Sequence, residues 1–259
     1  MLEVSPPRTE GALTLVDAVP RGAVLSEGSQ DAVRDVRGLD PPFEVMTRGQ
    51  TAALVDLKES LADHIPAALA VLMGTTLVVL FLMTGSVVLP LKALLMNLLT
   101  MSAAFGILVL IFQDGRLEGL LDYTSQGALE ATQPIFLFAV AFGLSTDYGV
   151  FLLARIKEAR DAGIPNDEAV AIGLERTGRI VTAAALLFSV AVGAFATSEI
   201  VFIKELGIGT ALAVLIDATI VRALLVPSLM KLLGDWNWWA PRPLARLHAR
   251  IGLREGAPA

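Results

Sequence analysis

The sequence predicts an all-α membrane protein in which five transmembrane helices follow a small α/β segment. The first observation is composition, because 54% of the 259 residues are hydrophobic and the mean hydropathy is +0.66. The second is distribution, because residues 1–63 are polar whereas residues 64–233 carry long apolar runs. Several of these runs approach the roughly 20 residues that cross a bilayer as a helix. A soluble core of this size is expected to show shorter apolar stretches separated by charged faces.

The numbers of cysteine and histidine residues limit the kinds of chemistry that the chain can perform. The chain has no cysteine, which excludes disulfides and thiolate chemistry. Its two histidines, His64 and His248, lie at opposite ends of the membrane region, which argues against a histidine-based metal site. The net charge of −6 and the isoelectric point near 5.0 argue against nucleic acid as a partner.

The first fifty residues are typical of a strand–helix–strand fragment. Residues 12–16 and 43–47 have strand-like patterns, and residues 26–39 have helical spacing between them. Such a fragment is too small to bury a core of its own. We therefore expect residues 1–50 to be part of a larger external domain.

Residues 51–234 are predicted to form the membrane bundle. A helical pattern that starts at Thr51 leads straight into the first span. The last apolar run is longer than one span needs, so we expect a tilted helix that bends near Pro227. Between the third and fourth spans, residues 155–179 are charged and partly amphipathic, which predicts a segment on the cytoplasmic surface. The five predicted spans are residues 65–84, 91–112, 133–154, 180–198 and 202–233.

Positive charge predicts the orientation. One side of the alternating topology has only Arg116 and Lys204 near the membrane. The other side is therefore cytoplasmic, and residues 235–259 form a cytoplasmic tail of a multi-pass protein in the inner (plasma) membrane. The N-terminal segment then lies outside without a signal peptide, so we expect a larger protein or a second polypeptide. The cytoplasmic side carries Lys92, Arg155, Lys157, Arg160, Arg176, Arg179, Lys231, Arg242, Arg246, Arg250 and Arg254.

Asp147 is the candidate for proton chemistry, because charged side chains inside a bilayer are costly and are usually functional. It lies in the third span, about 10 Å from the predicted cytoplasmic end. Tyr148 follows it, but adjacent helix residues point about 100° apart, so the two face different partners. The alternative is a structural aspartate bonded to another helix. Small residues such as Gly143 on both sides favour function, because they leave room for water and for close helix approach.

Four further polar residues of the spans are considered. Asp217 and Arg222 are five residues apart, which is poor spacing for a direct bridge on an α-helix. We expect structural roles for them, with Arg222 reaching the cytoplasmic interface and Asp217 meeting Arg179 or a helix terminus. Thr182 and Ser189 bracket the estimated depth of the acid in the third span, which makes them candidates for supporting a proton relay. Ordinary hydroxyl contacts between helices are the more common role for such residues.

Enzymatic readings are disfavoured. An intramembrane aspartyl protease needs two facing aspartates in YD and GxGD motifs, whereas this chain has DY and an Asp217 without the glycines. Serine or metal chemistry inside the membrane lacks the histidine that it needs. The chain is therefore predicted not to be an enzyme.

Three segments carry a family resemblance: AFGLSTDYGVFLLARI, GLERTGRIVTAAALL and LIDATIVRALLVPSLMKLLGDWNWWAP. With them, residues 53–247 resemble the C-terminal half of the MMPL (mycobacterial membrane protein large) transporters of the resistance–nodulation–division (RND) superfamily. Residues 1–50 are similar to the last strand–helix–strand of that family's external porter domain. The resemblance implies an RND-type half-transporter with five helices after the porter domain.

The resemblance also implies a mechanism. Family members export lipids or other hydrophobic molecules by using proton influx, so the proton gradient is the energy source and no cofactor is implied. An Asp-Tyr pair on the middle helix of each half forms the proton relay, and Asp147 with Tyr148 matches the second pair. The implied partners are the lipid bilayer, a hydrophobic or lipid substrate, and the missing N-terminal half or another RND/MMPL chain.

Two alternatives stay open. The chain is expected to be a partial exporter that needs the other half, because the first Asp-Tyr pair is absent. A non-transporting membrane module, or a truncated or decayed gene product that only inserts and associates with a partner half, is the first alternative. A sterol-sensing or protein-export-assisting branch of the superfamily is the second, and the DWNWW ending argues against it.

Overall fold

The computed structural model describes residues 2–20, 26–125, 127–130 and 132–252. The chain divides into two units, residues 1–68 and 69–259. Within the described residues, five helical stretches are long and apolar enough to cross a membrane. This confirms the predicted class of membrane all-α protein with a small strand-containing fragment at the N-terminus. The five stretches are Gln50–Thr84, Val88–Gln113, Gln133–Asp161, Asn166–Thr197 and Val201–Trp238.

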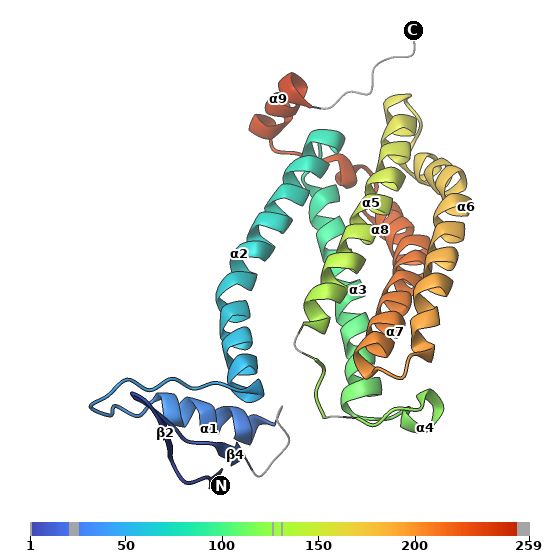
Figure 1. The fold of residues 1–259 in the computed structure, drawn as a ribbon. Helices are drawn as coiled ribbons and strands as arrows, with labels where there is room; N and C mark the ends of the chain where they lie inside the picture. Colours follow the sequence, from blue (N-terminus) through green and yellow to red (C-terminus); the bar gives the residue numbers. More distant parts are fainter. Residues whose placement is uncertain (1, 21–25, 126, 131, 253–259) are drawn as a thin grey trace. The chain divides into compact units, whose positions relative to one another are not determined.

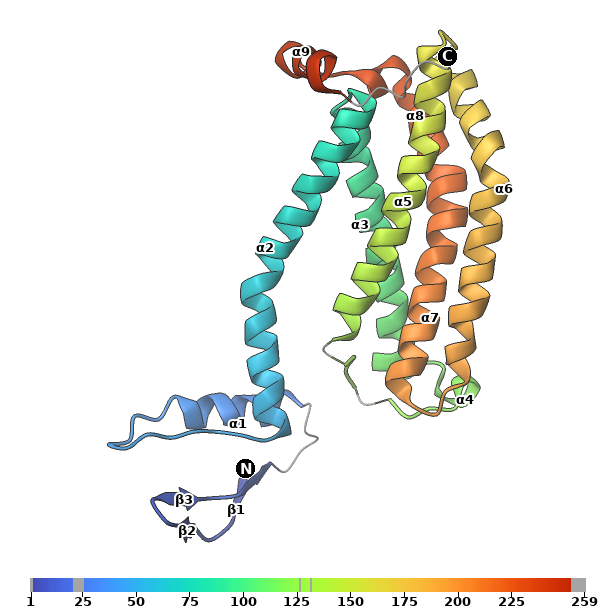
Figure 2. The ribbon, with the colours of Figure 1, turned by 45° about the horizontal axis from the view of Figure 1, so that its top comes forward.

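The described residues of the first unit form two short antiparallel strand pairs, helix α1 (Glu27–Arg37) and the beginning of a long second helix. Strand β1 (Leu2–Val4) pairs with β4 (Ala18–Pro20). Strand β2 (Arg8–Glu10) pairs with β3 (Leu13–Leu15) in a hairpin, which Figure 2 shows beside β1. The strand expected at residues 12–16 falls on β3, and the helix expected at 26–39 falls on α1.

The strand expected at residues 43–47 is not present. This segment has no regular secondary structure, and the side chains of Phe43 and Met46 are exposed. Its Thr47 accepts a hydrogen bond from Arg37 Nε over 2.7 Å. The alternating pattern fails here because a strand is stabilised by pairing with a neighbour, and no described strand lies alongside.

Helix α2 (Gln50–Thr84) begins in the first unit and ends in the second. It runs without a break, as the pattern from Thr51 predicts, and contains Pro66 within its length. A proline inside a helix removes one backbone hydrogen bond, and such residues are tolerated in transmembrane helices.

The second unit is a bundle in which α3 (Val88–Leu108), α5 (Gln133–Asp161), α6 (Asn166–Gly193) and α7 (Val201–Ile216) run side by side (Figures 1 and 2). Helix α3 continues as a π-helical turn, η1 (Val109–Gln113). At this end of the bundle lie the short helix α4 (Glu118–Leu121) and the first residues of α5 and α7. We call it the α4 end.

Residues 155–179 are divided between two helices and do not form a separate surface segment, contrary to expectation. Helix α5 extends to Asp161, and α6 begins at Asn166 after a turn in which Gly163 has φ +86°. The amphipathic face of α6 packs against α5. A Cβ placed on Gly173 would lie 2.4 Å from Ile156 Cγ1. The apolar stripe is therefore used for packing between α5 and α6.

The last apolar stretch bends as a π-helix. Helix α7 continues into η3 (Asp217–Leu225), and α8 (Val226–Leu233) follows with Pro227 in its first turn. Because proline has no backbone N–H and its ring clashes with the preceding turn, a wider π-helical segment before Pro227 accommodates it. The bend expected near Pro227 stays a prediction, and the π-helix lies directly before this residue. The chain then forms a short 3₁₀ helix, η4 (Gly234–Trp238), and α9 (Arg242–Ile251).

Asn237 joins the end of the chain to the bundle. Its side chain is 0% exposed and donates to the carbonyl of Met230 over 2.7 Å. Its Oδ1 accepts a hydrogen bond from Lys92 Nζ over 3.3 Å. Its carbonyl accepts one from Ser86 Oγ over 2.5 Å. The GDWNWW segment therefore fixes the turn between α2 and α3 as well as its own backbone.

Candidate functional site

A buried ion pair lies at the centre of the bundle. Arg222 and Asp217 are each 6% exposed. Arg222 Nη2 and Nε donate to Asp217 Oδ2 over 2.7 and 2.9 Å. The expectation that these residues do not bridge directly was wrong, as was the expectation that Arg222 reaches the interface. The physical reason is the π-helix, because its hydrogen bonds join residues i and i+5 and so bring residues five apart together.

Two other helices complete this polar network. From α5, Ser145 Oγ lies 2.8 Å from Asp217 Oδ1 and 2.7 Å from Oδ1 of Asn97 on α3. Its one hydroxyl hydrogen serves one of these acceptors at a time. The Ser145 carbonyl accepts a hydrogen bond from Arg222 Nη2 over 2.5 Å. Thr100 Oγ1 lies 3.5 Å from Asp217 Oδ1. The ion pair is therefore held by α3 and α5 together.

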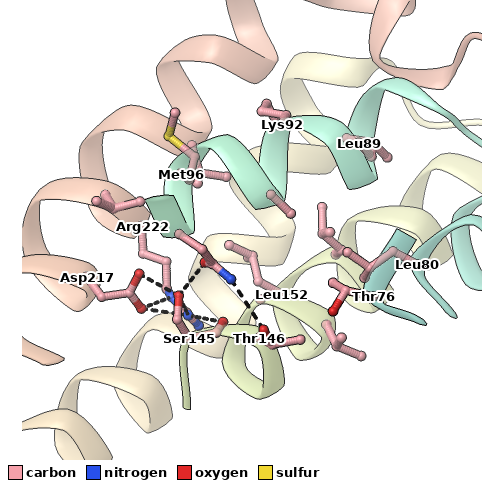
Figure 3. Close-up of a pocket in the computed structure, with 17 residues that line it drawn as sticks. Thr76, Leu80, Leu89, Lys92, Met96, Ser145, Thr146, Leu152, Asp217 and Arg222 are labelled. Carbon is pink, nitrogen blue, oxygen red and sulfur yellow. Dashed lines mark hydrogen bonds and ion pairs between the residues drawn. The ribbon is translucent and has the colours of Figure 1, made fainter. Parts of the chain in front are cut away.

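A cavity of about 50 Å³ adjoins the network (Figure 3). A water molecule needs roughly 10–15 Å³ of such space, so the cavity has room for a small group of waters. Asp147 and Tyr148 are not among its lining residues. Its polar lining consists of Thr76, Lys92, Asn97, Ser145, Thr146, Asp217 and Arg222.

Asp147 and Tyr148 face different surroundings, as their helical spacing predicts. The Asp147 side chain is exposed on the bundle surface, and it has no ion pair or hydrogen bond within the part of the chain that the structure describes. Tyr148 is half-buried, and Arg222 Cζ lies 5.4 Å from the centre of its ring. The tyrosine therefore contacts the buried ion pair, whereas the acid before it in the chain lies on the bundle surface.

The three candidates for relay support lie elsewhere. Gly143 and Thr182 are exposed, and a Cβ at Gly143 would meet open space. Ser189 is buried, and its hydroxyl donates to the carbonyl of Ala211 over 3.4 Å. This bond ties α6 to α7. Among the described residues, neither Thr182 nor Ser189 has a hydrogen bond to the Asp147 side chain, and Gly143 has no side chain to offer, so their part in a relay stays a prediction.

Asn97 and Thr100 are members of the network that the sequence reasoning missed. Both interrupt the apolar run LLMNLLT in α3. A polar residue inside a span is costly unless it is paired, and this signal was available from the sequence. The sequence does not identify the hydrogen-bond partners of these two residues, because the partners come together only when three helices pack.

The charged groups of this site differ in whether another charge balances them. The Asp217–Arg222 pair is neutral as a unit, and Nη1 of Arg222 has no hydrogen-bond partner among the described atoms. Asp147 has a charge that no described cation balances. A proton bound at Asp147 would change the net charge beside Tyr148, and the arginine over the Tyr148 ring would experience that change.

Fold and site together define a multi-pass helical membrane protein with ionisable groups inside its spans. The sequence model of the MMPL family matches residues 22–252. The chain therefore belongs to the MMPL family, which confirms the resemblance described above.

Three relatives match this chain at different levels of sequence identity. The putative membrane protein SCO6666 of Streptomyces coelicolor is 52% identical over 88% of this chain and 32% of its own length. The trehalose monomycolate exporter MmpL3 of Mycolicibacterium smegmatis is 46% identical over 88% of this chain and 23% of its own. The heme uptake protein MmpL11 of Mycobacterium tuberculosis is 34% identical over 100% and 27%, respectively. The chain thus spans between about a quarter and a third of these relatives.

Proposed function

We propose that the chain is part of a proton-driven exporter of lipids or other hydrophobic molecules, in which Asp147 binds the transported proton. The observation that carries the proposal is the position of Asp147, an acid on a membrane span with no partner among the described residues. Because a charge inside a bilayer is costly, binding a proton stabilises Asp147 there. The proton gradient is the only energy source that this proposal needs.

Tyr148 is proposed to transmit the protonation state of Asp147. Its ring lies against Arg222, and Arg222 is bound to Asp217 and to the Ser145 carbonyl. A shift of the Tyr148 side chain toward or away from Asp147 changes its contact with the arginine. The arginine in turn links η3 to α5, so the two helices can respond together.

A second helical bundle is the proposed partner for the face that carries Asp147. Along α5, the exposed residues Phe136, Ala139, Gly143 and Asp147 form a stripe in which two of the four are small. Small residues let helices approach closely within a membrane. A second MMPL half that packs here would bring its own polar groups to Asp147.

The cargo is proposed from the relatives' names. MmpL3 is named as an exporter of trehalose monomycolate, and MmpL11 as a heme uptake protein. We propose export of a lipid or another hydrophobic molecule because MmpL3 matches this chain at the higher identity. The positive residues of segment 155–179 and of the C-terminal segment support a cytoplasmic C-terminus and an external N-terminal segment, with the α4 end facing outward.

The test uses the chain together with a second MMPL half in sealed proteoliposomes. Asp147→Asn removes the titratable group and keeps its size, so proton-driven lipid export is expected to be lost. The matched control is Asp161→Asn, because Asp161 lies at the exposed end of α5 in an ion pair with Lys157. Full export by the Asp147→Asn assembly would overturn the relay role. An assembly that forms but moves no protons with wild-type Asp147 would favour the non-transporting module.

A further inference from the structure

A second group of unsatisfied polar atoms lies at the α4 end of the bundle. Five buried side-chain atoms in the described residues have no hydrogen-bond partner, and three of them belong to Gln133 and Glu205, near the starts of α5 and α7. Gln133 is 0% exposed and Glu205 is 4% exposed. Buried polar groups are paired in the great majority of cases. A concentration of unpaired ones therefore indicates a site that takes a polar ligand.

Glu205 and Gln133 lie at the same place in the bundle. The backbone of Glu130 lies beside the Glu205 carboxyl, and the carbonyl of Glu130 accepts a hydrogen bond from the Gln133 N–H over 3.1 Å. Glu205 thus lies next to Glu130, and Gln133 begins α5 three residues after Glu130 in the chain. Figures 1 and 2 show the first turns of α5 and α7 next to each other at this end.

No described cation pairs with Glu205. Its neighbour Lys204 is turned away, because Lys204 Nζ donates to the carbonyls of Leu121 and Asp122 at the end of α4. The other titratable groups that face Glu205 are Glu130 and Tyr123. Burial raises the pKa of Tyr123, and the charges of Glu118 and then Glu205 raise it further. The surroundings of the Glu205 carboxyl are therefore acidic or neutral.

The segment after α3 covers this end of the bundle. Ser125 Oγ donates to the Phe112 carbonyl over 2.7 Å, and the Tyr123 hydroxyl donates to the Ile111 carbonyl. Together with the Lys204 bonds to the end of α4, these contacts hold the segment over the first turn of α7. Glu205, the next residue of that turn after Lys204, is 4% exposed.

Two buried stripes lead from this end to the central network. On α5 every fourth residue from Gln133 to Ser145 is buried, and on α7 and η3 every fourth residue from Glu205 to Asp217 is buried. The stripes meet at their far ends, where Ser145 Oγ lies 2.8 Å from Asp217 Oδ1. Between the two polar ends lies one apolar cluster that includes Leu108, Leu137, Ala141 and Ala213.

We propose that Glu205, with Gln133 beside it, is a proton-binding site at the α4 end, separate from Asp147 and divided from the central network by the apolar layer. In the binding step, hydronium gives its proton to the Glu205 carboxylate and leaves as water, so the carboxyl becomes neutral. Gln133 supplies both a donor and an acceptor to the carboxyl or to water beside it. Its role in export rests on the function proposed above, in which the α4 end faces outward.

The apolar layer prevents direct proton transfer from Glu205 to the central network. Twelve residues separate Glu205 from Asp217, which is roughly 18 Å along a helix with a rise of 1.5 Å per residue. No proton passes that distance in one step, so Glu205 collects protons from the outer solution and transfer inward requires water to enter the apolar layer. Glu205 is thus a loading site, and Asp147 stays the group proposed to couple the proton to transport.

The test measures protonation of a single carboxyl and needs no transport. The full chain is placed in sealed proteoliposomes, and infrared difference spectra are recorded on acidification of the solution at the α4 side. A carboxylic C=O band is expected in the wild type, lost in Glu205→Gln, and retained in Glu199→Gln. Glu199 is an exposed acid six residues earlier, which makes it a matched control. Acidification of the opposite side alone is expected to leave this band absent.

Two further variants distinguish the possible explanations of a lost band. Glu205→Asp keeps a titratable group and is expected to restore a shifted band, which separates loss of the proton site from misfolding. Asp147→Asn is expected to retain the Glu205 band, so failure of the relay proposal leaves this test unaffected. The site assignment is overturned if Glu205→Gln keeps the wild-type band, or if sodium at constant pH removes the band, which would indicate a metal-cation site.

Discussion

Arg222 places its guanidinium carbon 5.4 Å from the centre of the Tyr148 ring while the same guanidinium binds Asp217 over 2.7 Å. One side chain thus connects the aromatic residue next to Asp147 with a buried carboxylate on a different helix. The π-helix makes this arrangement, because it brings Arg222 back over Asp217 and leaves its outer face for the ring.

Replacing Arg222 with glutamine is expected to destabilise the bundle strongly. Removal of one partner leaves Asp217 as a buried carboxylate without its cation, a change that costs about 3–5 kcal/mol. The double change Asp217→Asn with Arg222→Gln removes both charges and is expected to recover a substantial part of the loss. Unfolding in detergent, followed by circular dichroism, measures both variants. Equal destabilisation in the single and double variants would show that the charge pair is not the cause.

Two changes at Tyr148 are expected to separate the ring from the hydroxyl. Tyr148→Phe keeps a ring beneath Arg222, so stability is expected to stay near that of the wild type. Tyr148→Leu removes the cation–π contact, which is worth about 0.5–2 kcal/mol. The same unfolding measurement compares them. If the hydroxyl transmits the state of Asp147, Tyr148→Phe also loses proton-driven export in the two-half assembly despite its stability.

The five spans could be predicted because long apolar runs leave few alternatives in a bilayer. The contact between Asp217 and Arg222 could not, since helical spacing places residues five apart on different sides. Only the π-helix before Pro227 reverses that conclusion, and its occurrence depends on packing. The same limit applied to residues 43–47, whose alternating pattern says nothing about whether a neighbouring strand exists.

The candidate site, like the fold, could be predicted from the sequence only in part. Asp147 was identifiable as a lone charge in an apolar run, and its lack of a described partner agrees with that reasoning. Glu205 sits only four residues after the start of α7, so its sequence position is that of an ordinary residue at a helix end. The segment around α4 is held against the same turn of α7 by the bonds from Lys204 to the Leu121 and Asp122 carbonyls, which join residues far apart in the chain.

Asn237→Leu is expected to destabilise the chain by about 1–3 kcal/mol, because it removes a buried hydrogen bond to the Met230 carbonyl and leaves Lys92 Nζ without the amide oxygen that it contacts. The neighbouring change Asp235→Asn is the matched control. Asp235 is exposed and forms a surface ion pair with Arg160, and such pairs contribute little. Thermal unfolding of the two variants under identical detergent conditions measures the difference. A larger loss in Asp235→Asn than in Asn237→Leu would contradict the proposed anchor.

Gly173→Ala is expected to force α5 and α6 apart, because the new Cβ would lie 2.4 Å from Ile156 Cγ1 and 3.3 Å from the Ile156 backbone nitrogen. Overpacking of this kind costs about 1–3 kcal/mol. Gly178→Ala lies one and a half turns further along α6, where a Cβ meets open space, so it is expected to be neutral or slightly stabilising as a helix-favouring change. Ile156→Ala removes the Cγ1 atom, and combining it with Gly173→Ala is expected to cost less than the sum of the two single changes. The backbone contact stays, so the rescue is partial. Additive effects across this double-mutant cycle would show that Ile156 and Gly173 do not share the helix contact.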